Sequence, residues 1–227
     1  MSIIENNLKE IYTNMECALK KTNRTLADAT LVGVTKNIDV DTIKILLDQG
    51  VKTLGENRVQ EFLPKYEALK EQDITWHFIG NLQTNKVKYI IDKVDLIQSV
   101  NSTRLADEIN KQAKKINKVQ DILLEINISE EESKIGMDKT EVDIFINHIQ
   151  NLHNIRLKGL MTIAPNVKET GELREYFRCL EEKFIDIRQI CSHNIKMQYL
   201  SMGMTGDYDI ALESGANMIR IGSGIFY

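Results

Sequence analysis

A lysine and an arginine, far apart in the chain, occupy places where side chains could do chemistry. Lys36 follows the apolar run "TLVGV" at 30–34, which reads as a buried strand, and Arg220 directly precedes the turn "IGSG" at 221–224. An uncharged amine can form a Schiff base with a carbonyl compound, and the backbone N–H groups of a glycine-rich turn bind phosphate. These residue types could thus react with a carbonyl group and bind a phosphate, but position alone favours a solvated loop lysine for Lys36, with a functional amine as the alternative.

Arg220 is expected to point into the interior of the fold. Side chains alternate along a strand, so Ile219 and Ile221 share one face while Met218 and Arg220 share the other. A buried guanidinium needs a partner. The partner is either a bound ligand or, as the structural alternative, an acidic side chain on the opposite side of the fold.

A phosphate site is expected where two neighbouring strand ends meet. Gly222 and Ser223 lie in the glycine-rich turn, and Ser201, Met202 and Thr205 lie in "LSMGMTGD" at 200–207. The helix that follows this second segment would add the positive end of its dipole. A glycine-rich turn alone is more often only a turn, but two adjacent donor-rich ends favour a binding site.

Two further polar residues have open roles. Asn57 is expected at the start of a helix, where it either caps that helix or lines the pocket. His77 lies within an apolar strand, where a hydrogen-bonded core histidine is at least as reasonable as a pocket residue.

Short β-branched runs alternate with amphipathic helical patterns along the whole chain. The expected strands lie at 30–34, 51–55, 74–80, 94–100, 121–128, 155–163, 197–201 and 217–222. Helices are expected at 3–20 and near 40–49, 57–70, 83–92, 103–117, 139–150, 169–191 and 207–214. Asp39, Ser102 and Asp138 are the expected N-caps.

This order predicts the fold class. Strands and helices alternate without hairpin signals, and parallel strands need such crossovers. The units suit an α/β fold of the closed (β/α)₈ barrel type, with an open doubly wound sheet as the alternative. Without a linker or repeat, residues 1–227 are expected to form one domain. The chain ends soon after the eighth strand, so the helix at 3–20 is expected to cover the place of a last helix.

Composition excludes several classes of protein. The net charge of −4 is spread along the chain without a basic block, so nucleic acid is not an expected partner. Cys17, Cys179 and Cys191 lie outside metal-binding spacings and read as free thiols of a reducing compartment, the last two buried on one long helix. The N-terminus lacks the apolar core of a signal peptide, and no segment is long enough to span a membrane. A cytoplasmic location is expected.

The strand-end motifs, in this order, resemble the pyridoxal phosphate homeostasis proteins, the YggS-like family, which is similar in turn to the barrel domain of alanine racemases. The resemblance covers about residues 32–226. Thr35 stands where the family often has serine, residues 37–39 are "NID" where a proline often follows, and "MGMT" replaces "MGMS". The shared motifs are the lysine after the first strand, "GENR" (55–58), "WHFIGNLQTNK" (76–86), the pattern of Glu131, Lys134 and Gly136, "GLMTIAP" (159–165), "LSMGMTGD" and "RIGSGIF" (220–226).

The resemblance implies a barrel of the alanine racemase N-terminal type that binds pyridoxal 5′-phosphate (PLP) as an aldimine of Lys36. It places Asn57 near the cofactor ring and Arg220 against the pyridine nitrogen. Because only an uncharged amine attacks the aldehyde, Lys36 is expected to be partly buried at the barrel mouth. The cofactor-binding residues expected overall are Lys36, Asn57, His77, Ser201, Met202, Thr205, Arg220, Gly222 and Ser223.

Three functions remain open at this point. The first is a protein that holds PLP and hands it over, without strong turnover, with PLP-dependent apoenzymes as transient partners. The second is an amino-acid racemase, but its relatives add a second domain that supplies another base, and no residues remain here for one. The third is a cofactor-free aldolase, which Arg220 disfavours. The carrier is expected to be a monomer, because its pocket uses residues of one chain.

Overall fold

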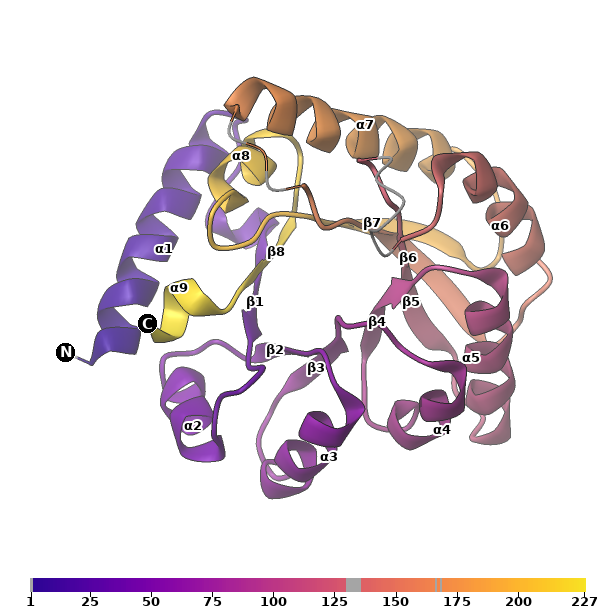
Figure 1. The fold of residues 1–227 in the computed structure, drawn as a ribbon, viewed down its shortest axis with the longest axis horizontal. Coiled ribbons are helices and arrows are strands. Elements are labelled where there is room, and N and C mark those ends of the chain that lie inside the picture. The colour runs from indigo at the N-terminus through magenta and orange to yellow at the C-terminus, as the bar shows by residue number, and fades with distance from the viewer. Residues whose placement is uncertain (1, 130–135, 166, 168) are drawn as a thin grey trace.

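The core of the structure is a closed barrel of parallel strands. In the computed structural model, which describes residues 2–129, 136–165, 167 and 169–227, eight strands pair in chain order and β8 closes on β1 (Figure 1). The prediction of a (β/α)₈ barrel is confirmed, and the open sheet is wrong. The strands are β1 (Thr30–Val34), β2 (Thr53–Glu56), β3 (Thr75–Phe78), β4 (Leu96–Val100), β5 (Gln120–Glu125), β6 (Ile155–Met161), β7 (Ile195–Ser201) and β8 (Met218–Ile221).

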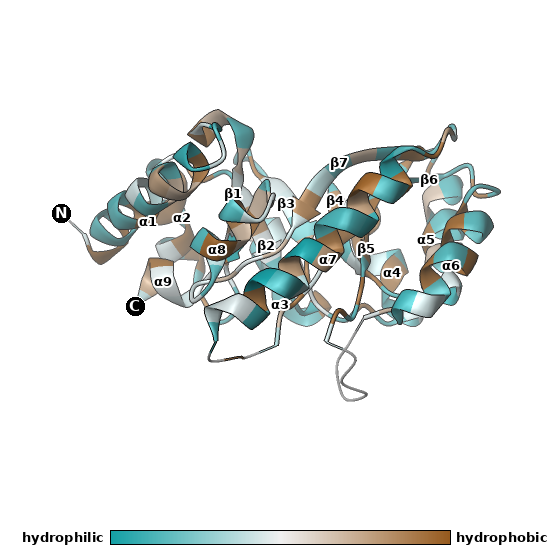
Figure 2. Ribbon diagram, turned by 90° about the horizontal axis from the view of Figure 1, so that it is seen from above, coloured by the Kyte–Doolittle hydropathy of each residue, from teal (hydrophilic) through white to brown (hydrophobic). Residues whose placement is uncertain are grey.

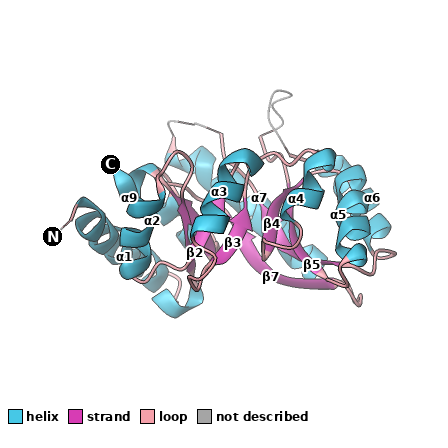
Figure 3. Ribbon diagram, turned by 90° about the horizontal axis from the view of Figure 1, so that it is seen from below, coloured by secondary structure: helices cyan, strands magenta, loops and turns pink. Residues whose placement is uncertain are grey.

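Helices surround the strands as an outer ring (Figures 1 and 3). They are α1 (Ile3–Lys20), α2 (Val40–Asp48), α3 (Val59–Ala68), α4 (Val87–Ile90), α5 (Thr103–Lys115), α6 (Val142–Ile149), α7 (Thr170–Arg188), α8 (Tyr208–Glu213) and α9 (Ser223–Phe226). The helix expected near 83–92 is shorter, because a 3₁₀ turn at Thr84–Lys86 takes its first part.

Side-chain caps begin several helices as predicted. The side chain of Asp39 accepts a hydrogen bond from the Thr42 N–H at the start of α2, and Ser102 accepts one from the Leu105 N–H at the start of α5. Asp138 instead caps a short 3₁₀ turn that leads into α6. Such caps satisfy backbone donors that have no partner inside the helix.

Helix α1 belongs to the outer ring beside α8 and α9 (Figure 1). The side-chain amide of Asn7 donates to the carbonyl oxygens of Ile225 and Tyr227 at 3.1 and 3.2 Å, and that of Asn14 donates to the Tyr208 hydroxyl at 3.1 Å. In the structure, α1 therefore covers the barrel beside α8 and α9, as the sequence predicts.

Apolar side chains form two layers, one inside the barrel and one between strands and helices. The inner layer consists of Val32, Leu96, Leu123, Met161 and Met218, with Tyr199 packed against it. The outer layer is much larger and takes the alternate residues of each strand together with the inner faces of the helices. Hydrophilic and hydrophobic residues accordingly alternate around α7 (Figure 2). The alternation of a strand thus assigns every side chain either to the interior or to the helix layer.

The cysteines differ in part from expectation. All three are free, but Cys179 and Cys191 are exposed, and Cys191 lies beyond the end of α7. The expectation of two buried thiols on one helix is wrong, because α7 ends at Arg188 and turns Cys179 toward solvent. Among the helices of the described residues, none is both long and apolar enough to cross a membrane.

Truncating the buried face of α1 should destabilise the whole barrel. Leu19 is fully buried, so Leu19→Ala should lower the free energy of unfolding by about 2–5 kcal/mol, as cavity-forming leucine truncations do. Urea unfolding followed by far-UV circular dichroism measures this. The control is Lys20→Ala, whose exposed pair with Glu16 is worth about 0.5 kcal/mol or less. Equal effects of the two changes would mean that α1 is not an integral layer.

Candidate functional site

A pocket of about 500 Å³ opens at the carboxyl ends of the strands. Because all strands run parallel, their ends meet at this one mouth, where barrel proteins gather functional side chains. The lining is Val34, Lys36, Asn57, Ile79, Gly80, Asn81, Glu125, Ile163, Met204, Thr205, Gly206, Arg220, Gly222 and Ser223.

Lys36 lies in a tight turn at the end of β1. The Ile38 N–H donates to the Thr35 carbonyl at 3.0 Å, and Asn37 has a φ of 60°. Asparagine tolerates this left-handed conformation better than most residues, which suits it to the third position of such a turn. The side chain of Lys36 lines the pocket but is exposed, so the expected partial burial at the mouth is wrong.

Arg220 is the buried cation of the pocket. It points inward from β8 as the alternation predicts and is only 4% exposed. Its guanidinium donates to the Ser201 hydroxyl at 2.7 Å and to the Thr162 carbonyl at 2.8 Å. Burial lowers the pKa of Arg220, while the carboxylates of Glu125 and Asp207 oppose that shift. The guanidinium therefore remains charged at neutral pH and can only donate hydrogen bonds.

A chain of hydrogen bonds continues from Arg220 across the interior. Ser201 donates its hydroxyl to Gln98 Oε1 at 2.7 Å, and Gln98 Nε2 lies 2.9 Å from His77 Nδ1. The donor-only arginine fixes the direction of this chain, so the Gln98 amide donates and His77 Nδ1 accepts. Burial lowers the pKa of His77 to about 4, and the ring is therefore neutral at pH 7 with its proton on Nε2.

Glu125 is the charged pocket residue that sequence reasoning missed, whereas the other lining residues that it missed are uncharged. It lies at the end of β5, is 2% exposed and shares the inward face with Leu123. Burial raises the pKa of Glu125 to about 7, and the charge of Arg220 acts in the opposite direction. A carboxylate at an inward position directly after the apolar residues 122–124 was the signal in the sequence.

The ends of β7 and β8 form a wall of hydroxyl groups and glycines. The Thr205 hydroxyl accepts a hydrogen bond from the Gly224 N–H at 3.2 Å and lies 3.1 Å from the Ser223 hydroxyl. A Cβ at Gly224 would meet Thr205 Cγ2 at 2.8 Å, whereas one at Gly206 would meet nothing within 4 Å. The wall is thus tightly packed at Gly224 and open at Gly206.

Asn57 follows β2 and also lines the mouth. The N-cap of α3 is Arg58, so the interpretation of Asn57 as a helix cap is wrong. Its Oδ1 atom is buried and has no hydrogen-bond partner within the described part of the chain. An acceptor left in that condition is suited to a donor on a ligand.

The pocket contains most of the expected residues but not all of them. Lys36, Asn57, Thr205, Arg220, Gly222 and Ser223 line it together. Ser201 and His77 lie deeper and connect to it only through the hydrogen-bond chain, and Met202 is packed in the outer apolar layer. Glu131 and Lys134 lie outside the described residues.

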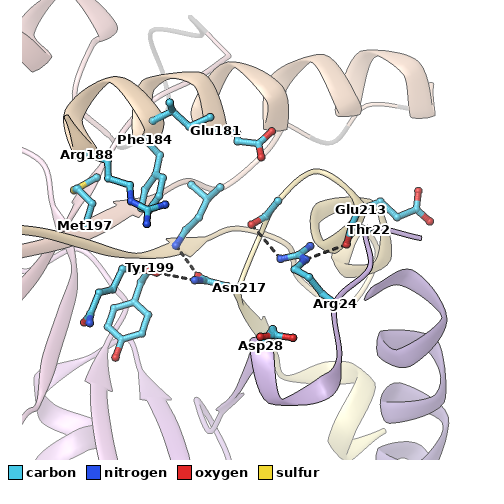
Figure 4. Close-up of a pocket in the computed structure, with 14 residues that line it drawn as sticks. Thr22, Arg24, Asp28, Glu181, Phe184, Arg188, Met197, Tyr199, Glu213 and Asn217 are labelled. Atoms are coloured by element: carbon cyan, nitrogen blue, oxygen red, sulfur yellow. Dashed lines mark hydrogen bonds between the residues drawn. The ribbon is translucent and has the colours of Figure 1, made fainter. Parts of the chain in front are cut away.

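A larger hollow of about 780 Å³ lies at the opposite end of the barrel, beside α7 (Figure 4). Arg24 projects into it but already donates to the carbonyl oxygens of Leu212 and Ala216. Glu213 pairs with Lys21 and Arg174. Because these charged groups are satisfied by the protein itself, the mouth around Lys36 is the stronger candidate site.

Comparison with known proteins agrees with this geometry. The family model "Alanine racemase, N-terminal domain" matches residues 7–227. The structure is similar to that of an alanine racemase from Clostridium difficile, with a TM-score of 0.71 and 18% identity over 98% of this chain and 56% of that chain. This likeness concerns the fold, and it defines the class: a barrel of the alanine racemase N-terminal type.

Two relatives indicate which family within this class the chain belongs to. The pyridoxal phosphate homeostasis protein of Aquifex aeolicus is 42% identical over 96% of this chain and 95% of its own length. The structure of PipY from Synechococcus elongatus with PLP bound has a TM-score of 0.86 and 27% identity, covering 100% of both chains. The chain belongs to the pyridoxal phosphate homeostasis protein family.

The protonation of Glu125 should appear in the pH dependence of stability. The pKa of Glu125 rises from 4.5 in the unfolded chain to about 7 in the fold, so the folded state favours the protonated carboxyl. The contribution of this carboxyl to the free energy of unfolding is therefore complete below pH 4.5 and is lost as the pH rises through about 7. Glu125→Gln should abolish this loss. Between pH 4.5 and pH 8, the free energy of unfolding of the variant should rise by about 3 kcal/mol relative to that of wild type.

Urea unfolding at a series of pH values tests this. The exposed Glu71→Gln serves as control, and its stability should run parallel to wild type throughout. A parallel profile for Glu125→Gln as well would show that Glu125 has the same proton affinity in the folded and unfolded chain.

Proposed function

We propose that this protein binds PLP at the barrel mouth through a Schiff base to Lys36 and serves intracellular PLP homeostasis without strong catalytic turnover. The observation that carries the proposal is the convergence of the Lys36 amine and the buried Arg220 guanidinium on one pocket. The relative PipY, whose structure carries PLP, supports it.

The residues at the mouth fit PLP in charge, hydrogen bonding and space. The pocket offers an amine for the aldehyde and hydroxyl groups and glycines for the phosphate. For the ring hydroxyl it offers Asn57 Oδ1, which has no hydrogen-bond partner among the residues that the structure describes. The open space at Gly206 gives access to backbone N–H groups without side-chain bulk. The aliphatic residues Val34 and Ile79 can flank an aromatic ring.

Lys36 holds the cofactor covalently. Its Nζ condenses with the aldehyde carbon and one water is released, so hydrolysis returns free aldehyde and free amine. When bound, PLP supplies this aldehyde carbon and an electron-poor ring. The exposure of Lys36 gives water and competing amines access to the link, which suits a protein that must release its cofactor.

Arg220 limits what the bound cofactor can do. A guanidinium only donates hydrogen bonds, so a ring nitrogen that faces it must accept and remain unprotonated. Such a ring withdraws little electron density, whereas strong electron withdrawal helps an enzyme to remove a Cα proton. Arg220 therefore holds the ring while giving little help to racemisation.

The same proposal includes the setting in which the protein works. Residues 1–227 act as one domain and as a monomer, because the closed barrel leaves none of its eight strands with an edge free to pair with a second chain. The free thiols of Cys17, Cys179 and Cys191 agree with the reducing cytoplasm. PLP-dependent apoenzymes are transient partners that take up the cofactor on its release.

Borohydride reduction should attach a pyridoxyl group to Lys36. Purified protein with PLP should absorb in the visible range, and peptide mapping after reduction should find the label on Lys36. Lys36→Ala should lose both the band and the label. The control is Lys88→Ala, which removes an exposed lysine outside the pocket. A label on another lysine, or a band that survives in Lys36→Ala, would refute the covalent role.

Amino acids should keep their Cα protons in the presence of the loaded protein. We expect negligible deuterium exchange at Cα of alanine in heavy water, because the ring nitrogen opposite Arg220 stays unprotonated. NMR measures the exchange, with Arg220→Ala and Arg220→Glu beside wild type. Enzyme-like exchange in wild type would favour the racemase alternative. Unchanged PLP affinity in both variants would show that Arg220 does not contact the ring.

A further inference from the structure

The turn that carries Lys36 is hydrogen-bonded to the last residue of β2 and to helix α3. Lys65 Nζ donates to the Thr35 carbonyl at 2.6 Å, and the Thr35 hydroxyl donates to Glu56 Oε1 at 2.6 Å. Glu61 Oε2 accepts from the Asn37 N–H at 3.3 Å. The residues on both sides of Lys36 are thus tied to residues 56–65.

Two of these contacts come from a buried ion pair. Lys65 Nζ lies 2.7 Å from Glu56 Oε1, with the Glu56 side chain fully buried and that of Lys65 11% exposed. A buried pair of this kind costs desolvation that its attraction often fails to recover, and an apolar pair of similar volume is often as stable. Glu56 Oε2 even lacks a hydrogen-bond partner within the described residues. Stability alone is therefore a weak reason for the pair.

The position of the pair suggests another reason. Glu56 follows the inward-facing Gly55 on β2 and points into the helix layer, where α3 supplies Lys65. Helix α3 is fixed to the barrel by Phe62, which is fully buried and packs edge-on against Trp76 at a centroid distance of 5.3 Å. Lys65 thus links a fixed helix to the peptide group that joins Thr35 to Lys36.

We propose that Glu56 and Lys65 are positioning residues that fix the turn of Lys36 so that its amine faces the pocket. This inference rests on the proposed function of Lys36. The Thr35 carbonyl accepts from both Lys65 and the Ile38 N–H, so the ion pair and the turn share one acceptor. The pair orients Lys36 and does not itself touch the cofactor.

The double variant Glu56→Leu/Lys65→Met separates positioning from stability. It replaces the ion pair by apolar groups, so thermal unfolding of the cofactor-free protein should stay close to wild type. Its PLP dissociation constant, measured by absorbance titration, should rise at least about tenfold. In the cofactor-free double variant, the Ile38 amide should exchange with deuterium faster than in wild type. Its acceptor, the Thr35 carbonyl, no longer receives the hydrogen bond from Lys65 Nζ that fixes its position.

Two further variants keep the test decisive. Lys70→Met removes an exposed lysine that pairs with Glu67, and it should change neither affinity nor Ile38 exchange. Thr35→Val removes the hydroxyl contact with Glu56 Oε1 at 2.6 Å and the longer one with the Gly55 carbonyl at 3.5 Å, and it should weaken PLP binding by a few-fold. If the double variant does not fold, Thr35→Val carries the test through the same two measurements.

The outcomes distinguish this inference from the proposed function. Wild-type affinity and wild-type Ile38 exchange in a folded double variant, or in Thr35→Val where the double variant does not fold, would overturn the positioning role while Lys36 remains the labelled residue. Absence of a borohydride label on wild-type Lys36 would instead overturn the proposed function. Faster Ile38 exchange together with weaker PLP binding supports the positioning role.

Discussion

Closure of a parallel sheet is the constraint on which the rest of the structure depends. Once eight parallel strands close on themselves, every carboxyl end lies on one rim and no strand edge is left to pair with another chain. Lys36 and Arg220 come from opposite ends of the chain, yet β1 and β8 are neighbours in the barrel. The meeting of amine and guanidinium at one mouth is a direct result of this closure.

Local pattern was enough to predict a large part of this arrangement. The alternation of strands and helices predicted the barrel, and the alternation of side chains predicted that Arg220 points inward. Both depend on periodicities that a single element carries in its own sequence. The caps at Asp39 and Ser102 are equally local, because a cap and the N–H it binds lie three residues apart.

Features that need two distant elements could not be predicted in the same way. In the sequence alone, Lys65 on α3 has the pattern of a solvated lysine. Its role is visible only in the structure, where β2 and the Lys36 turn contact its amine. Gln98 gains its role only when the register of β4 sets it between Ser201 and His77. The exposure of Lys36 likewise depends on the loops around it. In each case the missing information is the spatial relation of two segments, which no single periodicity contains.

The hydrogen bonds that lead inward from Arg220 form a chain with one direction, from guanidinium to hydroxyl to amide to imidazole. A substitution at one position therefore changes what the next position must donate or accept. An aspartate at Ser201 could accept from Arg220 but could no longer donate to Gln98. Residues 77, 98, 201 and 220 are therefore energetically coupled, and a substitution at one of them requires a compensating substitution at its neighbour in the hydrogen-bond chain.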